Sequence, residues 1–315
     1  MSSLYFESLR RPVDAPLPVP GFIQPDLATI LVPERPLFGL RQLEVDWEEP
    51  TGTLWTHMRF RGRPSYNPDL LIDFRAWQDG IERMFAGRET DLRYLVLGSR
   101  FPGVFSLGGD LKQFAGWIRK RDYDALVHYG KSCVHILHRN MAGLDLPVVT
   151  IGLVQGDALG GGFESVLSFN LIVAEKGAKF GFPENLFGLF PGMGALSLLA
   201  RRIGTARAEA MLLSGATYTA EEMHELGVVQ ILAEPGEGAA AVRHYIDRHA
   251  RRHNGHRAIY RAAREVNPVP LVELERIVEI WAEAALNLRD KDLRVMERLV
   301  AAQDRLLGIP AVAAE

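Results

Sequence analysis

Short apolar segments alternate with amphipathic helical segments along the middle of this chain, and this alternation is the feature that most constrains the fold. The apolar runs LRYLVLGSR, PVVTIGLVQG and NLIVAE each have the length and β-rich composition of a buried strand. Between the first two lies a long helical stretch, roughly residues 123–141, and the segment LLIDFRAWQDGIERMFAG precedes the first with apolar residues three and four apart. Strands joined by helical crossovers predict an α/β layered core.

The chain divides into three regions by composition. Residues 1–42 contain many prolines and little periodicity, which is typical of an irregular arm. Residues 43–235 begin with an alternating segment, LEVDWEEPTGTLWTHMRF, that predicts a β-hairpin, and contain all of the predicted α/β core. Residues 236–315 are expected to form a helical C-terminal region.

Composition excludes several classes of function. The net charge of −3 and a pI near 6.3 do not favour nucleic acid or an anionic membrane as partner. No apolar run is long enough to span a membrane, the N-terminus lacks a secretory signal, and Cys133 is the single cysteine. We therefore expect a cytoplasmic protein without disulfides or a membrane span.

Two glycine-rich segments, FSLGGDL and GDALGGGFES, offer backbone N–H groups to a ligand. A helix that begins near Gly161 would leave its first N–H groups free, and the missing Cβ atoms would let a ligand approach closely. The N–H of Gly109, after a predicted strand, is a second candidate donor. Two donors aimed at one carbonyl oxygen would form an oxyanion hole, each contributing roughly 3–4 kcal/mol.

Two glutamates, Glu164 and Glu184, lie in otherwise apolar surroundings beside this glycine-rich backbone. Burial raises the pKa of a carboxyl group toward neutrality, where it serves as a general acid or base. A pair of such groups facing one substrate would hydrate or dehydrate the carbons next to an activated carbonyl. No G-x-S-x-G segment occurs, which disfavours a serine hydrolase.

Each of these residues also has an ordinary structural explanation. Three glycines are often a tight turn, and a glutamate in the first turn of a helix often compensates the helix dipole. Glu184 after a proline is typical of a helix start, and Asp110 is better explained as a helix cap than as a catalyst.

Taken together, FSLGGDL, GDALGGGFE and FPENLFGLFPGMGA resemble the crotonase (enoyl-CoA hydratase/isomerase) superfamily in order and separation. More narrowly, LVQGDALGGGFES, LIVAEKG, LFPGMGA and the C-terminal RIVEIWAEAALNLRDKDLRVMERLVAAQ resemble the diffusible signal factor synthases, which make cis-2-unsaturated fatty acid signals in bacteria. The resemblance covers about residues 43–307 and implies a spiral of ββα repeats with a helical C-terminal layer.

The resemblance also implies roles for eight residues. Glu164 and Glu184 would be the catalytic pair, and the N–H groups of Gly109 and Gly161 the oxyanion hole. The expected acyl-chain and carrier contacts are the remaining four: Leu107, Met193, Trp281 and Leu299. The residues alone predict Trp281 as a core side chain, and only the resemblance places it in the acyl-chain tunnel.

The reaction that the resemblance implies has two steps. A 3-hydroxyacyl thioester, on acyl carrier protein or coenzyme A, is dehydrated to a cis-2-enoyl thioester and then hydrolysed to the free acid. No metal or redox cofactor is expected, the assembly would be a trimer or hexamer, and a sensor kinase's receiver domain is a possible regulator. Two alternatives remain open: an enoyl-CoA hydratase of fatty-acid degradation, and a catalytically silent binding protein of the same fold.

Overall fold

The computed structural model describes residues 36–309, so the part of the predicted arm before residue 36 lies outside the described residues. Ten strands form two sheets within this range. The larger sheet has the order β1-β2-β3-β5-β7-β10, with bounds Leu43–Glu48, Thr53–Met58, Tyr94–Ser99, Val149–Val154, Leu171–Glu175 and Ile231–Ala233. The smaller sheet has the order β4-β6-β8-β9, with bounds Val104–Ser106, Asp157–Leu159, Lys179–Gly181 and Thr217–Thr219.

From β3 to β8, consecutive strands alternate between the two sheets, and this alternation defines the fold. β3, β5 and β7 pair in parallel in the larger sheet, and the strand after each of them, β4, β6 and β8, pairs in parallel in the smaller one. Each turn of the chain thus adds one strand to each sheet before the next helix. The predicted spiral of ββα repeats is confirmed.

The hairpin predicted from residue 43 onward is present. β1 and β2 pair antiparallel, and Gly52 closes the turn with φ +65°, a left-handed conformation that favours glycine. The three- and four-residue spacing after residue 67 gives α1 (Pro68–Phe85), which Asn67 caps by accepting from the Leu70 N–H.

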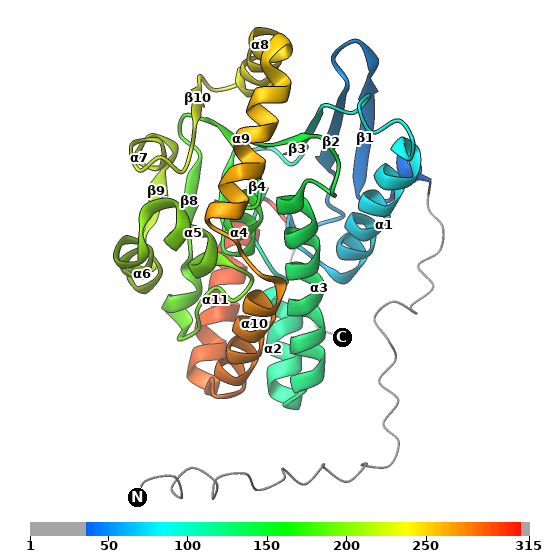
Figure 1. The fold of residues 1–315 in the computed structure, drawn as a ribbon. Coiled ribbons are helices and arrows are strands. Elements are labelled where there is room, and N and C mark those ends of the chain that lie inside the picture. The colour runs from blue at the N-terminus through cyan, green and yellow to red at the C-terminus, as the bar shows by residue number, and fades with distance from the viewer. Residues whose placement is uncertain (1–35, 310–315) are drawn as a thin grey trace, which may run out of the picture. The chain divides into compact units, whose positions relative to one another are not determined.

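The crossover helices cover one face of the larger sheet. α1, α2 (Leu111–Lys120) and α3 (Tyr123–Ala142) enclose the main apolar core together with the smaller sheet. After α4 (Gly161–Val166) come three short helices at the edge of the smaller sheet, labelled in Figure 1: α5 (Ala195–Ile203), α6 (Thr205–Ser214) and α7 (Ala220–Glu225).

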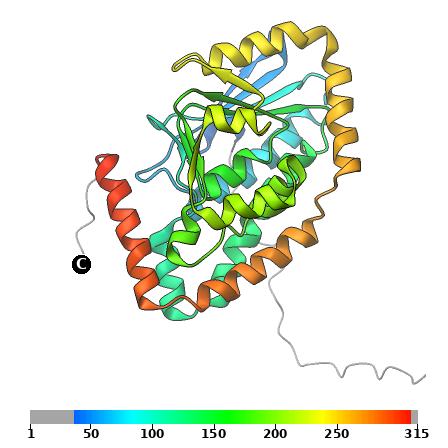
Figure 2. The ribbon, with the colours of Figure 1, turned by 90° about the vertical axis from the view of Figure 1, so that its left-hand side faces the viewer.

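The last part of the described chain is helical. α8 (Gly238–His249) packs its Val242, Tyr245 and Ile246 against the opposite face of the larger sheet. α9 (His253–Val266) leads to α10 (Leu271–Leu286), which packs on α3, and to α11 (Asp290–Leu306), which packs on α2. Figure 2 shows these helices, yellow through red, following one another around the sheets.

Three-residue strands are the elements that sequence patterning missed. β4, β6 and β9 are each three residues long and fall in no segment predicted as a strand, whereas β8, of the same length, lies in the short apolar segment AKFGF, which predicts a strand. A period-two pattern is not detectable over so few residues, and the backbone pairing across the smaller sheet defines these strands instead.

Candidate active site

One cavity contains all eight residues that the sequence and its resemblance single out. Its walls come from α1, α2, α3, α4, α10 and α11 and from the loops after β4 and β8, and its volume is about 1030 Å³, including the space open to solvent at its mouth. The eight residues among its lining are Leu107, Gly109, Gly161, Glu164, Glu184, Met193, Trp281 and Leu299.

The two glycine-rich segments meet backbone to backbone at this cavity. A Cβ added to Gly108, which has φ +86°, would lie 2.6 Å from the Gly161 nitrogen, and a Cβ on Gly161 would lie 3.4 Å from the Gly109 nitrogen. Within residues 36–309, neither the Gly109 nor the Gly161 N–H donates to a protein acceptor. Two free N–H groups therefore lie side by side at the cavity wall, as an oxyanion hole requires.

Glu164 is held by one of its two carboxylate oxygens. It lies on α4, is 1% exposed, and its Oε1 accepts from the N–H groups of Met193 (2.7 Å) and Ala195 (3.0 Å). Its Oε2 is buried and has no hydrogen-bond partner in the described chain. Burial raises the pKa of Glu164 to about 7, although the two backbone hydrogen bonds act in the opposite direction.

Glu184 reaches the same cavity from the short 3-10 helix Pro183–Phe187 that follows β8. A Cβ on Gly160 would lie 2.5 Å from the Glu184 Oε1, so the first of the three glycines makes room for this carboxylate. Burial, and then repulsion from Glu164, raise the pKa of Glu184 to about 8. Both carboxyl groups are thus shifted toward neutrality, where a carboxyl group can exchange a proton with a substrate.

The apolar positions taken from the resemblance lie in the wall of the same cavity. Trp281 on α10 is 2% exposed, stacks edge-to-face with Phe114 at 5.3 Å, and contacts the Gly192 backbone so closely that no Cβ fits there. Its side chain is thus both core and cavity wall. Asp110 caps α2 by accepting from the Lys112 and Gln113 N–H groups, so its interpretation as a helix cap is confirmed.

Sequence reasoning missed the polar residues of the cavity wall. Tyr66, from the loop before α1, and Ser165 share a hydrogen bond of 2.6 Å, and Asn140 on α3 donates to Ser168 at 2.8 Å. Ser165 lies on α4 beside Glu164, and Ser168 follows shortly after the helix ends, so their closeness to Glu164 in sequence could have indicated them. Tyr66 and Asn140 carried none, since only the tertiary fold places them beside α4.

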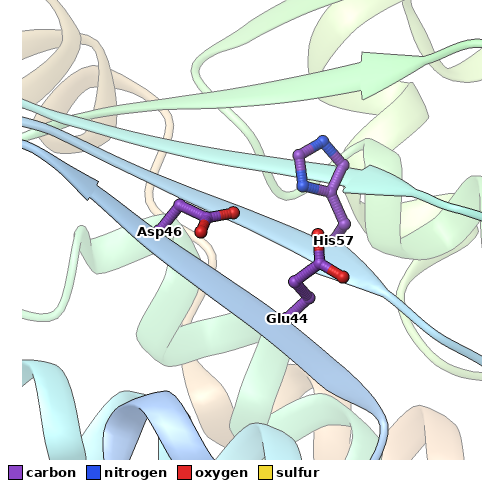
Figure 3. A group of neighbouring side chains, drawn as sticks. All are labelled: Glu44, Asp46 and His57. Atoms are coloured by element: carbon purple, nitrogen blue, oxygen red, sulfur yellow. The ribbon is translucent and has the colours of Figure 1, made fainter.

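A second group of titratable side chains lies outside this cavity, on the β1–β2 hairpin. Figure 3 shows Glu44 and Asp46 from β1 near His57 from β2. Arg100 donates to the Glu44 carboxylate at 2.7 Å, Arg59 lies 3.5 Å from it, and these guanidinium groups lower the pKa of Glu44. Because two guanidinium groups already neutralise Glu44, we assign this group to an ion-pair network between β1 and the residues that follow β2 and β3.

Comparison with known proteins identifies the class of protein. The enoyl-CoA hydratase/isomerase family pattern matches residues 79–267, more than half of the chain. The chain therefore belongs to the enoyl-CoA hydratase/isomerase family, whose members are enzymes of the lyase type and related isomerases.

Individual relatives agree with this membership. The chain is 32% identical to the mitochondrial methylglutaconyl-CoA hydratase of Rattus norvegicus over 190 residues, 60% of this chain and 56% of the rat protein. It is 26% identical to a probable mitochondrial enoyl-CoA hydratase 2 of Arabidopsis thaliana over 231 residues, 72% of this chain and 68% of that one. The match thus spans little more than half of the rat protein's length.

Solved structures share the fold. The human mitochondrial delta3-delta2-enoyl-CoA isomerase superposes with a TM-score of 0.70 at 17% identity, covering 84% of this chain and 99% of the isomerase. DspI of Pseudomonas aeruginosa superposes with a TM-score of 0.57 at 22% identity, over 84% of this chain and 96% of DspI. Within residues 36–309, no helix combines the length and apolar character needed to cross a bilayer.

Proposed function

We propose that this protein dehydrates a 3-hydroxyacyl thioester by acid–base catalysis with Glu164 and Glu184. The observation that carries the proposal is the pair of buried carboxyl groups in one cavity, with pKa values of about 7 and about 8, beside the two unpaired N–H groups of Gly109 and Gly161. The lower pKa suits a base and the higher one an acid at neutral pH.

The proposed steps follow from these protonation states. The thioester carbonyl accepts from the Gly109 and Gly161 N–H groups, which stabilise the enolate as it develops. Ionised Glu164 removes a proton from the α-carbon, and protonated Glu184 donates its proton to the departing β-hydroxyl. The products are a 2-enoyl thioester and water, with Glu164 protonated and Glu184 ionised.

The finer part of the proposal is that the enoyl product has cis geometry and is released as the free acid. After dehydration, ionised Glu184 is a base that can activate a water molecule for attack on the thioester carbonyl. The same N–H groups would stabilise the tetrahedral oxyanion, and water would replace the thiol to give a carboxylic acid. Support comes from the resemblance of the segments around Glu164 and of the C-terminal helices to the diffusible signal factor synthases.

The remaining parts of the proposal rest on that resemblance. The thioester would be carried by acyl carrier protein or coenzyme A, the chain would assemble as a homotrimer or hexamer, and a receiver domain would regulate it. The proposed acid–base steps balance without a metal or redox cofactor. The favoured location is the cytoplasm.

A mass-spectrometric assay tests the proposal directly. Purified protein is incubated with 3-hydroxydodecanoyl thioester, on acyl carrier protein and on coenzyme A in parallel. We expect a free cis-2-enoic acid, with the rate reduced roughly 10²–10⁴-fold in Glu164→Gln and in Glu184→Gln.

Other outcomes would support the alternatives. A reversible trans-2-enoyl thioester without free acid would indicate an enoyl-CoA hydratase, which the same two glutamates serve. No turnover of either thioester would contradict the proposal and favour a binding protein.

A further inference from the structure

Two buried side-chain amide oxygens that lack a hydrogen-bond partner line the cavity. They belong to helices that are distant in sequence from the two glutamates. Gln78 on α1 is 0% exposed and Asn140 on α3 is 5% exposed, and both line the cavity. Neither the Gln78 Oε1 nor the Asn140 Oδ1 has a hydrogen-bond partner in the described chain. An unpaired buried acceptor is costly, so two in one cavity indicate that a ligand group pairs with them.

The hydrogen-bond network fixes which atom of each amide is free. The Gln78 Nε2 donates to the carbonyl oxygen of Ile136 at 2.9 Å, and a carbonyl can only accept. The Asn140 Nδ2 lies 2.8 Å from the Ser168 Oγ, whose own hydrogen is donated to the Ser165 carbonyl at 2.6 Å. Rotating either amide by 180° would place two acceptors against each other, so the oxygens are the free atoms.

The neighbouring hydroxyl groups have no hydrogen left to offer. Ser165 donates to the Gly162 carbonyl at 2.8 Å, so Tyr66 must donate in its 2.6 Å contact with the Ser165 Oγ. Tyr129 donates to the Tyr66 carbonyl at 2.5 Å. These hydroxyl groups therefore offer no hydrogen to the two amides, and the free Gln78 and Asn140 oxygens, both acceptors, select a ligand group that donates.

We propose that the acyl chain accepted by this cavity carries a hydroxyl group beyond the reacting carbons, whose single hydrogen is shared between the Gln78 and Asn140 side-chain oxygens. This rests on the proposed function, because it assumes that an acyl thioester occupies the cavity. The surrounding walls, among them Leu71, Phe74 and Trp77, are apolar, which favours a neutral hydroxyl over an ammonium group. A keto group at the same carbon has no hydrogen to donate, so its oxygen would face the Gln78 and Asn140 oxygens without forming a hydrogen bond.

The test compares three matched series of coenzyme A thioethers with chains of 8 to 14 carbons. These analogues stand in for the acyl thioesters but do not react. One series is unsubstituted, one carries a hydroxyl on the penultimate carbon, and one carries a keto group there. Binding to the wild-type protein is measured by calorimetry, independently of turnover. We expect the hydroxylated analogue to bind about tenfold more tightly than both others at the chain length that reaches the two amides.

The outcomes separate this inference from the proposed function. If all three series bind alike at every length, ordered water satisfies the two amides and the inference is wrong, whereas the acyl cavity stands. If none of them binds, the assignment of the cavity to acyl thioesters is wrong, and the inference fails with it.

Variants add a second line of evidence. Gln78→Leu and Asn140→Leu each remove one acceptor at similar volume, and we expect each to reduce the preference for the hydroxylated chain to within about threefold. Tyr94→Phe is the matched control, because the Tyr94 hydroxyl is also buried without a partner but lies on the opposite face of the sheet. It should keep the wild-type preference, and circular dichroism would verify the folding of all three variants.

Discussion

Glu164 and Glu184 lie in the same cavity, but the chain holds them differently. Glu164 is anchored through Oε1 by two backbone N–H groups, which stabilise its ionised form, whereas Glu184 lies beside Gly160 and experiences the charge of Glu164. These surroundings raise the pKa of Glu184 further than that of Glu164. In the proposed mechanism, these different surroundings make one of two identical side chains the base and the other the acid.

At the residue scale, we expect a bell-shaped pH dependence of kcat/KM for dehydration. Activity should rise as Glu164 ionises near pH 7 and fall as Glu184 ionises near pH 8. Initial rates between pH 5 and 10 would measure both limbs. A flat profile across this range would contradict the assigned protonation states.

The same burial should make Glu164 destabilising at alkaline pH. The pKa of an unperturbed glutamate carboxyl is 4.5, whereas that of Glu164 in the folded protein is about 7. Between these values the folded state binds a proton that the unfolded state has lost, so the free energy of unfolding falls as the pH rises. Glu164→Gln removes the ionised form and should be more stable than wild type by about 2 kcal/mol at pH 8.5, with a smaller difference at pH 5.

Urea unfolding at both pH values measures this effect. Glu209→Gln, at an exposed position on α6, is the control and should show no such pH-dependent gain. A Glu164→Gln variant with equal or lower stability than wild type at pH 8.5 would show that the carboxylate is not destabilising.

At the element scale, the loop after β4 and the start of α4 position the two N–H donors. Gly108 brings this loop against α4 with a positive φ, and an added Cβ would lie 2.6 Å from the Gly161 nitrogen. Backbone atoms cannot move aside as a flexible side chain can. The two elements are therefore coupled through one glycine.

Gly108→Ala should separate the two donors and reduce kcat roughly 10²-fold or more. Gly116→Ala, within α2, is the matched control because a Cβ there meets no atom within 4 Å. The control should retain activity and gain about 0.5–1 kcal/mol of stability from a better helix former. Steady-state kinetics and thermal unfolding compare both variants, and equal kcat values would refute the role of this contact.

At the scale of the whole molecule, the C-terminal helices complete the cavity. Leu299 and Gln303 of α11 contribute to its lining, and Asp304 of the same helix binds Arg63, from the loop before α1, at 2.5 Å. Lys112 of α2 lies 3.4 Å from the other Asp304 oxygen. Segments more than 200 residues apart in sequence thus close the cavity together.

Arg63→Met should therefore weaken both stability and substrate binding. We expect a loss of about 1–3 kcal/mol in unfolding free energy, because the Arg63–Asp304 pair is largely buried, and a higher KM because α11 is held less firmly. Arg119→Met breaks an exposed pair with Glu297 between α2 and α11 and should cost less than about 1 kcal/mol. Equal effects of the two variants in urea unfolding and kinetics would contradict this closure.

Much of the fold was predictable because its elements have local causes. The β1–β2 hairpin, α1, α3 and the Asp110 cap all follow from periodicity and capping within a short stretch of chain. The strands of the smaller sheet did not follow, because three residues carry no measurable pattern and their pairing partners lie far away in sequence. The arm before residue 36 and the domain boundaries remain predictions.

The candidate site divides in the same way. Glu164, Glu184 and the paired glycines were found from their spacing, because a buried carboxyl beside glycine-rich backbone is unusual in any local context. Their proposed roles, and those of Met193, Trp281 and Leu299, remain predictions. The Gln78 and Asn140 acceptors were not found, since a single amide within a helix carries no local signal of its tertiary neighbours.

The sequence by itself thus determined the α/β class, the main helices, the family resemblance and the residues that could act as acids, bases or hydrogen-bond donors. Only the tertiary structure decided that strands alternate between two sheets, that Gly108 abuts α4, and that α11 closes the cavity through Arg63. The physical reason is range: helix periodicity and capping act between neighbours, whereas burial, and with it the raised pKa of each glutamate, depends on every element that excludes water from the cavity.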